Sequence, residues 1–586
     1  MRTLRIALAQ VNTAVGDIDG NAQRLIDAMS SAREAGAELV AFPELAITGY
    51  PPEDLVLHRS FVADNRAALE RVAAAAQGIS AIVGFVDGSP ERGEPLYNAA
   101  AFLNEGRVAA IYRKIHLPNY GVFDEERYFE RGFECPVIDF GGVRIGISIC
   151  EDVWEPVGPS EVERAAGAEI NININASPFE RSKDDVRREL ISDLARRNQV
   201  FACYVNQVGG QDELVFDGTS LVYDPSGVII SEGKRFAEDL LVVDLDLDRV
   251  AAVRSGSVWD GPSTSELAEI GEATNISASR ADVSAWEALT TPILKDPLTE
   301  EAEVYRALVL GTRDYARKSG FDKAVIALSG GIDSTLTAVV AVDALGADNV
   351  LCVALPSRYS SDGSVTDAED LAERLGIKLW NLPIEPAHAA FEDILEEEFR
   401  GTDVNVAEEN VQSRVRGNVM MTISNKFGYL VLTTGNKSEF ATGYATLYGD
   451  MAGGYAVIKD VPKTLVFRLC EYRNEAGPGA PIPRSVIDKP PSAELRPDQL
   501  DSDSLPPYEI LDRILERYVE GLWDAEEIIA EEAGLGGGDG ETVRRVLRLV
   551  DRNEYKRRQS PPGVKITQLA FGRDRRMPIA SRYRPH

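Results

Sequence analysis

The amino-acid sequence predicts an α/β protein made of two different halves. Up to about residue 260, short apolar segments such as 4–11 and 170–175 alternate with stretches such as 21–36, whose apolar residues recur every three or four positions. This alternation is typical of a mixed α/β sandwich. From about residue 300, strand-like segments alternate regularly with helices, which predicts a parallel, doubly wound sheet with ligands at the carboxyl ends of its strands.

Each half contributes its own series of expected strands. In the first half they are 4–11, 37–44, 81–86, 98–103, 107–114, 143–150, 170–175, 200–207, 219–225 and 240–247. In the second half they are 324–328, 350–357, 378–384 and 429–436. The strand signal fades in the Ser-, Ala- and Glu-rich stretch 263–297, which we interpret as a linker between one domain at 1–262 and another at 298–586.

The amino-acid composition and net charge exclude some classes of binding partner. The 586 residues include 44% hydrophobic and 27% charged residues and carry a formal net charge of −32, so nucleic acid and anionic membranes are not expected as partners. No segment resembles a signal peptide or a membrane-spanning helix. The five cysteines form no C-x-x-C pair and the four histidines show no zinc spacing, which favours reduced thiols in a cytoplasmic protein.

The segment SGGIDS, residues 329–334, lies between an expected strand and an expected helix. The backbone N–H groups at a helix N-terminus bind anions, and the hydroxyls of Ser329 and Ser334 add possible donors. Gly330 and Gly331 are expected to let a phosphate approach the backbone closely. The alternative is an ordinary strand-to-helix turn; the serines and the Asp around the glycines favour a phosphate site.

Three reactive side chains stand at the ends of expected strands in the first half, namely Glu44, Lys114 and Cys150. Separately they fit a capping carboxylate, a surface lysine and a buried thiol. We expect the ends of neighbouring strands to bring them together as one site. Glu44 would then deprotonate Cys150, and Lys114 would stabilise the oxyanion that forms when the thiolate attacks a carbonyl.

The segments around these residues, FPELAITGYPPEDL, YRKIHLPNYGVFDEERYF and GISICEDVW, resemble the Glu-Lys-Cys motifs of the nitrilase superfamily. The closest similarity is to the glutaminase domain of glutamine-dependent NAD synthetases. This resemblance implies a nitrilase-like α-β-β-α sandwich that hydrolyses glutamine to glutamate and ammonia. It places the glutamine-binding side chains at Tyr120, Ser177 and Lys183. Glu125 matches a second glutamate often found beside the triad, and a carboxylate at a helix start explains it equally well.

The loop at 329–334 resembles the signature of the ATP pyrophosphatase group, which cleaves ATP to AMP and pyrophosphate; it lacks the Lys-Ser/Thr of a Walker A loop. Downstream, ENVQSRVRGNVMM, LTTGNKSEFATGYATLYGDMAGG, DVPKTLVFRL, KPPSAEL and NEYKRRQSPPGVKIT resemble NAD synthetases in order and spacing. The resemblance implies a sheet like that of the adenine nucleotide alpha hydrolases. On it, deamido-NAD⁺ would be adenylated with ATP and Mg²⁺ and then amidated.

This resemblance assigns roles to individual residues. The ATP-binding positions would be Ser329, Gly330, Gly331, Asp333, Ser334, Thr434, Lys463 and Ser492. The deamido-NAD⁺-binding positions would be Asn410, Arg414, Glu439 and Lys556. Asp333 and Glu439 are the expected Mg²⁺ ligands, because hard carboxylate oxygens suit that ion. For Arg416 we favour a helix face paired with the acidic surface. Leu447 stands where ammonia-only relatives typically carry a lysine.

Two other functions fit parts of the sequence. The chain could be another amidotransferase built on an ATP pyrophosphatase, for example one that aminates a nucleobase, but such enzymes usually have a different glutaminase. Alternatively, the first half could be a non-catalytic scaffold, which the intact Glu44, Lys114 and Cys150 argue against. The expected substrates are therefore glutamine, ATP and deamido-NAD⁺, with ammonia sheltered on its way between sites. A homo-oligomer is expected from the similar architecture of relatives.

Overall fold

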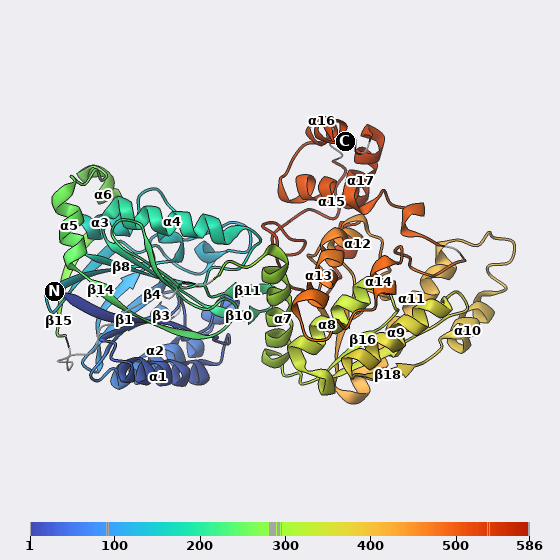
Figure 1. Cartoon of the computed structure of the whole chain (residues 1–586), viewed down its shortest axis with the longest axis horizontal. Helices are drawn as coiled ribbons and strands as arrows, with labels where there is room; N and C mark the ends of the chain where they lie inside the picture. The colour runs from blue at the N-terminus through green and yellow to red at the C-terminus, as the bar shows by residue number, and fades with distance from the viewer. Residues whose placement is uncertain are drawn as a thin grey trace. The chain divides into compact units, whose positions relative to one another are not determined.

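The computed structural model describes residues 2–89, 91, 93–280, 289, 294, 296–497, 499–535, 537 and 539–583. In this part of the chain, two compact units are present (Figure 1). Unit 1 comprises Met1–Gln211 and Val215–Pro297, and unit 2 comprises Asp212–Leu214 and Leu298–His586. None of the helices in these residues combines the length and apolarity that crossing a bilayer requires.

Two β-sheets form the centre of unit 1. The first has the order β14 (Asp239–Asp246), β1 (Thr3–Gln10), β2 (Leu39–Ala41), β3 (Ser80–Gly88), β4 (Leu96–Asn104) and β5 (Arg107–Arg113). The second has the order β13 (Ile229–Glu232), β12 (Leu221–Tyr223), β9 (Phe201–Asn206), β8 (Ile170–Asn175), β7 (Val143–Ile149), β6 (Glu134–Phe140) and β15 (Glu272–Ala278). A separate hairpin pairs β10 (Val208–Gln211) with β11 (Leu214–Asp217).

The two sheets pack face to face, and helices cover their outer faces. Leu4, Ile6 and Leu8 of β1 share one apolar cluster with Ile145 and Ile147 of β7, so this cluster fills the space between the sheets. The alternate β1 residues face outward into a second cluster with α1 and α2. The predicted α-β-β-α sandwich is confirmed, and both faces of β1 are buried, with Arg5 as a buried charge paired with Asp244.

Short helices and turns complete unit 1. Its α-helices are α1 (Ile18–Glu34), α2 (Arg59–Ala75), α3 (Pro159–Ala165), α4 (Lys183–Asn198), α5 (Asp248–Gly256) and α6 (Thr264–Ile270). Its 3₁₀ turns are η1 (Glu53–Leu57), η2 (Glu125–Arg127) and η3 (Cys150–Val153).

The stretch 263–297, predicted to be a linker, begins instead with regular structure. Helix α6 is capped by Ser263, and β15 pairs in parallel with β6 along its full length. The pattern was weak because β15 is an edge strand, on which Ala273, Ile276 and Ala278 are partly buried against the core and some residues between them are exposed. Residues 281–288, 290–293 and 295 of the predicted linker lie outside the described residues.

Unit 2 is built on a parallel sheet, as predicted. Its strand order is β18 (Lys378–Asn381), β17 (Val350–Ala354), β16 (Ala324–Ala327), β19 (Leu430–Thr433) and β20 (Tyr455–Ala456), and each of these neighbouring pairs is parallel. Because the chain runs from β16 to β17 on one side and returns to β19 on the other, the order reverses at β16. Ligands bind at such a switch point, at the carboxyl ends of the strands.

Helices surround this sheet and form a C-terminal helical cluster. They are α7 (Glu300–Lys318), α8 (Ile332–Leu345), α9 (Asp362–Leu375), α10 (Glu385–Leu395), α11 (Val406–Phe427), α12 (Lys437–Thr442), α13 (Lys463–Ala476), α14 (Arg484–Asp488), α15 (Tyr508–Leu515), α16 (Ala525–Gly534), α17 (Gly540–Arg552) and α18 (Glu554–Arg557). Shorter turns are η4 (Ala347–Asn349), η5 (Asp501–Asp503) and the π-helical η6 (Glu516–Glu520).

Candidate functional site

Glu44 lies in a tight turn that follows β2. The turn is held against β3 by Phe42 N–H, which donates to Ile82 O at 2.9 Å, and by Ile47 N–H, which donates to Gly84 O at 3.2 Å. A Cβ on Gly84 would lie 2.3 Å from the Leu45 nitrogen, so only glycine allows this approach. The turn directs the Glu44 carboxylate into the interior, where it is fully buried.

Lys114 follows β5 and is the centre of a buried cluster of charges. Its ammonium donates to Glu44 Oε1 at 2.7 Å and to both Glu125 oxygens at 2.9 Å. Asn98 on β4 donates to Glu44 Oε1 at 2.7 Å and to Glu125 Oε2 at 3.2 Å. Burial lowers the pKa of Lys114, but Glu125 and Glu44 outweigh it and raise that pKa well above its ordinary value. Lys114 therefore keeps its charge in the interior.

Cys150 follows β7 directly and opens η3 with a left-handed φ of +43°. Such a conformation is uncommon for a residue with a Cβ and marks a constrained turn. Burial and the negative charge of Glu44 raise the pKa of the Cys150 thiol well above its ordinary value, and Lys114 only partly opposes them. The resting residue is therefore a neutral thiol that needs a base to become a nucleophile.

The predicted triad is brought together, but not by neighbouring strands as we expected. Strands β2 and β5, which carry Glu44 and Lys114, are separated in the first sheet by β3 and β4, and Cys150 comes from the second sheet. The face-to-face packing of the two sheets creates the site instead. Glu125, for which a helix-start role was equally plausible, does begin η2, yet its carboxylate contacts Lys114 in the interior.

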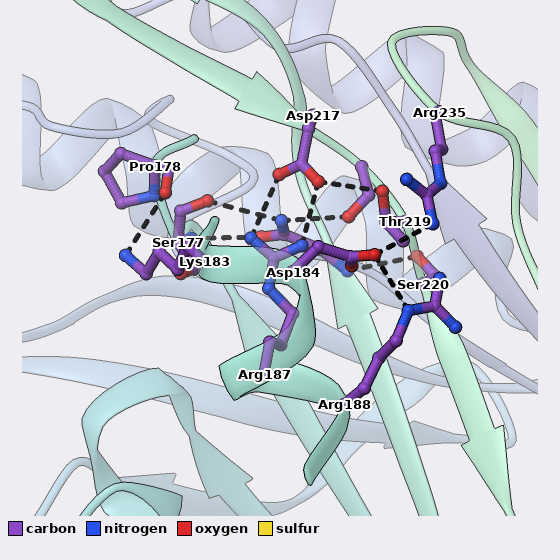
Figure 2. A network of polar contacts seen from close by, with 12 residues as sticks. Ser177, Pro178, Lys183, Asp184, Arg187, Arg188, Asp217, Thr219, Ser220 and Arg235 are labelled. Atoms are coloured by element: carbon purple, nitrogen blue, oxygen red, sulfur yellow. Dashed lines mark hydrogen bonds and ion pairs between the residues drawn. The ribbon is translucent and has the colours of Figure 1, made fainter. Parts of the chain in front are cut away.

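Three residues were predicted to bind glutamine. Two of them, Ser177 and Lys183, lie near one another in the sequence and in the structure (Figure 2). Ser177 is buried after β8, and its N–H donates to Asn206 Oδ1 at 3.0 Å. Lys183 opens α4 and donates to Pro178 O at 3.2 Å. Tyr120 is 58% exposed, and its phenol donates to both oxygens of Glu151, the residue after Cys150, at 3.0 Å.

The first turns of α4 are fixed by buried ion pairs (Figure 2). Arg187, one turn beyond Lys183, makes a bidentate pair with Asp217 at 2.9 and 3.1 Å. Asp184 accepts from Arg188 and Arg235, each at 2.8 Å. These contacts hold the helix end that carries Lys183, although no sequence motif pointed to them.

In unit 2, a cavity of about 600 Å³ opens at the carboxyl ends of β16, β17 and β19. Of the predicted residues, those that line it are Ser329, Gly331, Asp333, Ser334, Asn410, Thr434, Glu439, Lys463, Ser492 and Lys556. Among the described lining residues, Gly330 and Arg414 are not found. The structure therefore brings most of the predicted nucleotide-binding residues to one cavity.

The loop at 329–334 joins β16 to α8, and its two glycines have different roles. Ser329 Oγ lies 3.1 Å from Ser334 Oγ and accepts from Gly331 N–H at 3.3 Å. Gly330 has a φ of +75°, and a Cβ there would lie 2.1 Å from Ser364 O. The lack of a Cβ at Gly330 thus allows the loop to pack on α9, whereas Gly331 lines the cavity. That the backbone of Gly330 also meets a phosphate stays a prediction.

Two carboxylates and one ammonium meet beside this loop. Lys463 donates to Asp333 Oδ2 and, at 3.4 Å, to Glu439 Oε1, and Asn436 donates to Asp333 Oδ1 at 2.9 Å. Burial and the nearby Asp333 raise the pKa of Glu439 to about 8, with Lys463 opposing them. Among the described residues, no group of three or more His, Cys, Asp or Glu side chains forms a ready-made metal site.

Two arginines of α11 lie in different surroundings. Arg416 lines the cavity and donates to Leu355 O at 2.9 Å, and burial lowers its pKa to about 10. Arg414 is exposed and donates to Leu447 O at 3.3 Å. The surface role that we favoured for Arg416 is therefore wrong, because Arg416 supplies positive charge to the cavity. The contact of Arg414 with deamido-NAD⁺ stays a prediction.

The other predicted residues are held by local bonds. Asn410 accepts from Thr446 Oγ1 at 2.7 Å, and Ser492 donates to Gln499 O at 2.5 Å. Lys556 donates to Gly443 O at 2.7 Å and to Ala445 O at 2.8 Å. Burial lowers the pKa of Lys556.

Comparison with known proteins covers both units. A family model described as carbon-nitrogen hydrolase matches residues 5–255, and one described as NAD synthase matches residues 304–560. The chain is 46% identical over 590 residues to the glutamine-dependent NAD(+) synthetase of Thermotoga maritima, with 100% of each chain covered. It is 44% identical over 581 residues to that of Aquifex aeolicus, with 99% of this chain and 100% of the relative covered.

Solved structures give the same assignment. The glutamine-dependent NAD+ synthetase from Acinetobacter baumannii, in complex with adenosine diphosphate, matches with a TM-score of 0.73 and 38% identity over 99% of this chain and 98% of that chain. The one from Cytophaga hutchinsonii shares the fold, with a TM-score of 0.79 at 23% identity over 99% of this chain and 98% of that chain. With two domain families matched and full-length relatives at this identity, the chain belongs to the family of glutamine-dependent NAD(+) synthetases.

Proposed function

We propose that this chain hydrolyses glutamine in unit 1 and uses the ammonia to amidate deamido-NAD⁺ in unit 2, with ATP cleaved to AMP and pyrophosphate. The observation that carries the proposal is the presence in one chain of the two sites described above. One is the buried Glu44–Lys114 pair beside Cys150, and the other is the cavity at the SGGIDS loop. A non-catalytic first half would have no need for such a buried cluster of charges, because burying charge is costly.

In the first site, the proton of the Cys150 thiol passes to Glu44 as the sulfur attacks the side-chain carbonyl carbon of glutamine. Lys114 stabilises the negative charge on the carbonyl oxygen through its fixed position. The C–N bond then breaks, Glu44 returns the proton to the leaving nitrogen, and ammonia departs from a thioester. Water, deprotonated by Glu44, hydrolyses the thioester and yields glutamate and the free thiol.

Tyr120, Ser177 and Lys183 are the residues that we propose to hold glutamine. Lys183 is suited to a carboxylate, because its ammonium stands at the fixed first turn of α4. Tyr120 is exposed and therefore accessible to an incoming ligand, and the hydrogen bond from its phenol to Glu151 orients the ring.

In the second site, the nicotinate carboxylate of deamido-NAD⁺ attacks the α-phosphorus of ATP, and pyrophosphate leaves. Ammonia then attacks the carbonyl carbon of the adenylate, and AMP leaves with the former carboxylate oxygen. Ser329, Gly331 and Ser334 line the cavity at the start of α8, and we propose that they donate to the phosphates. Arg416 and Lys463 provide the local positive charge that a chain of net charge −32 otherwise lacks.

Asp333 and Glu439 fit the role of Mg²⁺ ligands. Both carboxylates accept from the Lys463 ammonium, and burial and the charge of Asp333 raise the pKa of Glu439, so a bound cation would favour its ionised form. Two carboxylates plus substrate phosphates are the usual ligand set for this ion. When bound, Mg²⁺ would neutralise charge that accumulates on pyrophosphate. The cytoplasmic location and the homo-oligomeric assembly stay predictions from the sequence.

A product analysis tests the proposed reaction. The purified chain is incubated with deamido-NAD⁺, ATP, Mg²⁺ and glutamine, and the products are separated by chromatography. We expect NAD⁺, AMP, pyrophosphate and glutamate in equal amounts. Formation of ADP and phosphate, or turnover of a nucleobase acceptor in place of deamido-NAD⁺, would contradict the assignment.

A further inference from the structure

Asp152, two residues after Cys150, is a buried carboxylate that the reaction above does not use. It is 1% exposed. In the described chain, its Oδ2 accepts from the Tyr112 hydroxyl at 2.6 Å and from Ile149 N–H at 2.8 Å. Its Oδ1 accepts from His116 N–H at 2.9 Å and from Ile115 N–H at 3.3 Å.

These donors come from the two segments that carry the nucleophile and the lysine. Ile149 immediately precedes Cys150, whereas Ile115 and His116 immediately follow Lys114. Tyr112 lies on β5, two residues before Lys114. The first segment belongs to the second sheet and the other to the first sheet, so one carboxylate ties both across the sandwich.

The chemistry of the contacts calls for a carboxylate at this position. All four partners within the described chain are donors, and an ionised carboxylate only accepts. An amide of the same shape would point its NH₂ group at the N–H groups of Ile115 and His116 in one orientation and at the N–H group of Ile149 in the other. Burial raises the pKa of Asp152, and the bonds from Tyr112, His116 and Ile149 oppose this rise.

The left-handed turn at Cys150 needs such a support. Backbone strain persists only where surrounding contacts over-determine it. The bond from Ile149 N–H to Asp152 spans the turn and fixes the direction of the Cys150 side chain. The bonds that Ile115 and His116 donate to Asp152 fix the backbone directly after Lys114.

We propose that Asp152 is a positioning residue that sets the distance between the Cys150 thiol and the Lys114 ammonium for glutamine hydrolysis. The proposal rests on the assignment of Cys150 and Lys114 in the proposed function. A misplacement of about 1 Å in a reacting group costs about 100-fold in rate. None of the donors to the Asp152 carboxylate described above is a residue proposed to bind glutamine, so its loss should change kcat rather than KM.

The test compares Asp152→Asn with the wild type in the full chain. We expect kcat for glutamine hydrolysis to fall about 100-fold, with KM within about twofold, because the substrate contacts stay in place. Alkylation of Cys150 by iodoacetamide, located by mass spectrometry, should slow in parallel. NAD⁺ formation from ammonium chloride should stay at the wild-type rate, which shows that the chain is folded.

Glu163→Gln is the matched control. Glu163 is also fully buried and accepts from Ile147 N–H of β7 at 2.8 Å and from Asn171 at 2.9 Å, and neither of these donors comes from the Lys114 segment. Its kcat should stay within about threefold of wild type. Equal losses in both variants would mean a general effect of buried carboxylates and would overturn the proposal. So would a kcat for Asp152→Asn within threefold of wild type.

Two further variants separate the possible failures. If Asp152→Asn does not fold, Tyr112→Phe removes one donor and keeps the carboxylate; we expect kcat to fall about fivefold at unchanged KM, and an unchanged kcat would overturn the proposal. Cys150→Ala tests the underlying assignment. If it still hydrolyses glutamine, the nucleophile is wrong and both proposals fall, whereas an inactive Cys150→Ala with a fully active Asp152→Asn refutes only the role of Asp152.

Discussion

The Lys114 ammonium lies 2.7 Å from Glu44 Oε1, and neither side chain is exposed to solvent. Lys114 also contacts Glu125, so one positive charge faces two carboxylates in the interior. Such a cluster is costly to bury and is tolerated only when each charge has a partner. The base and the oxyanion donor of the proposed hydrolysis are therefore also a structural unit, and their loss affects activity and stability together.

Lys114→Met is expected to abolish glutamine hydrolysis, with a loss of at least about 1,000-fold, because the oxyanion donor is gone. It should also lower the free energy of unfolding of unit 1 by about 3–5 kcal/mol, because two buried carboxylates lose their partner. Arg127→Met is the control: its ion pair with Asp54 is exposed, so its loss should cost less than about 1 kcal/mol. Chemical denaturation measures the free energy of unfolding of each variant, and equal destabilisation by the two substitutions would contradict this account.

Gly84→Ala is expected to reduce glutamine-driven NAD⁺ formation about 100-fold or more and to leave ammonium-driven formation unchanged. The added Cβ would meet the Leu45 nitrogen at 2.3 Å and displace the turn that carries Glu44. Steady-state assays with the two nitrogen sources measure the effect. Gly256, around which a Cβ would meet nothing within 4 Å, gives a matched Gly→Ala control that should keep both activities.

The two arginines of α11 provide a direct test of which side chain serves the nucleotide cavity. Arg416→Gln keeps a donor for Leu355 O but removes the charge, and we expect KM for ATP or deamido-NAD⁺ to rise about 10- to 100-fold, since a bond to a charged group contributes about 1.5–3 kcal/mol. Arg414→Gln should change either KM less than about threefold. A larger rise in KM for Arg414→Gln than for Arg416→Gln would instead support the predicted role of Arg414 in binding deamido-NAD⁺.

Glu439 should make nucleotide binding depend on pH. Since its pKa is about 8 without ligands, it holds a proton at pH 7 and must release it to bind Mg²⁺. Calorimetry of Mg·ATP binding at pH 7, in buffers of different ionisation enthalpy, should show a release of protons attributable to Glu439. Glu439→Gln should lose this release, and an unchanged value would exclude Glu439 as its source.

The raised pKa of Glu439 also makes the stability of the folded protein depend on pH. Between the ordinary pKa of a glutamate and about 8, the folded ligand-free protein binds a proton at Glu439 that the unfolded chain does not. The contribution of this group to stability is therefore full below that window and is lost as the pH rises through it. Mg²⁺ with ATP should offset the loss, because bound cations replace the proton.

Local patterns in the sequence predicted most strands and the loop at 329–334, because alternation and glycine turns are properties of short segments. Strands β6, β10, β11, β13 and β20 were not predicted. Local patterns predicted less well where a role depends on distant contacts. Strand β15 was missed because its exposed residues hide the apolar pattern, and Asn98, which bridges Glu44 and Glu125, lay unnoticed in an apolar strand. The partners of Asp152 lie on a strand of the other sheet, which no local pattern reveals.

The arginines show the same limit within one helix. Arg414 and Arg416 lie two residues apart, so their side chains point about 200° apart around α11. The sequence places both on one helix but does not reveal which face of it lines the cavity. Likewise, both glycines of the SGGIDS loop suit a phosphate site by residue type, and only the position of Ser364 shows that Gly330 serves packing.

The most direct test of the account is to exchange the nitrogen source in two variants, one for each unit. NAD⁺ formation is measured for wild type, Cys150→Ala and Asp333→Asn with either glutamine or ammonium chloride. We expect Cys150→Ala to lose only the glutamine-driven formation of NAD⁺. Asp333→Asn should lose NAD⁺ formation from both nitrogen sources, while its hydrolysis of glutamine persists. Glutamine-driven synthesis by Cys150→Ala, or wild-type synthesis by Asp333→Asn, would contradict the division of the reaction between the two sites.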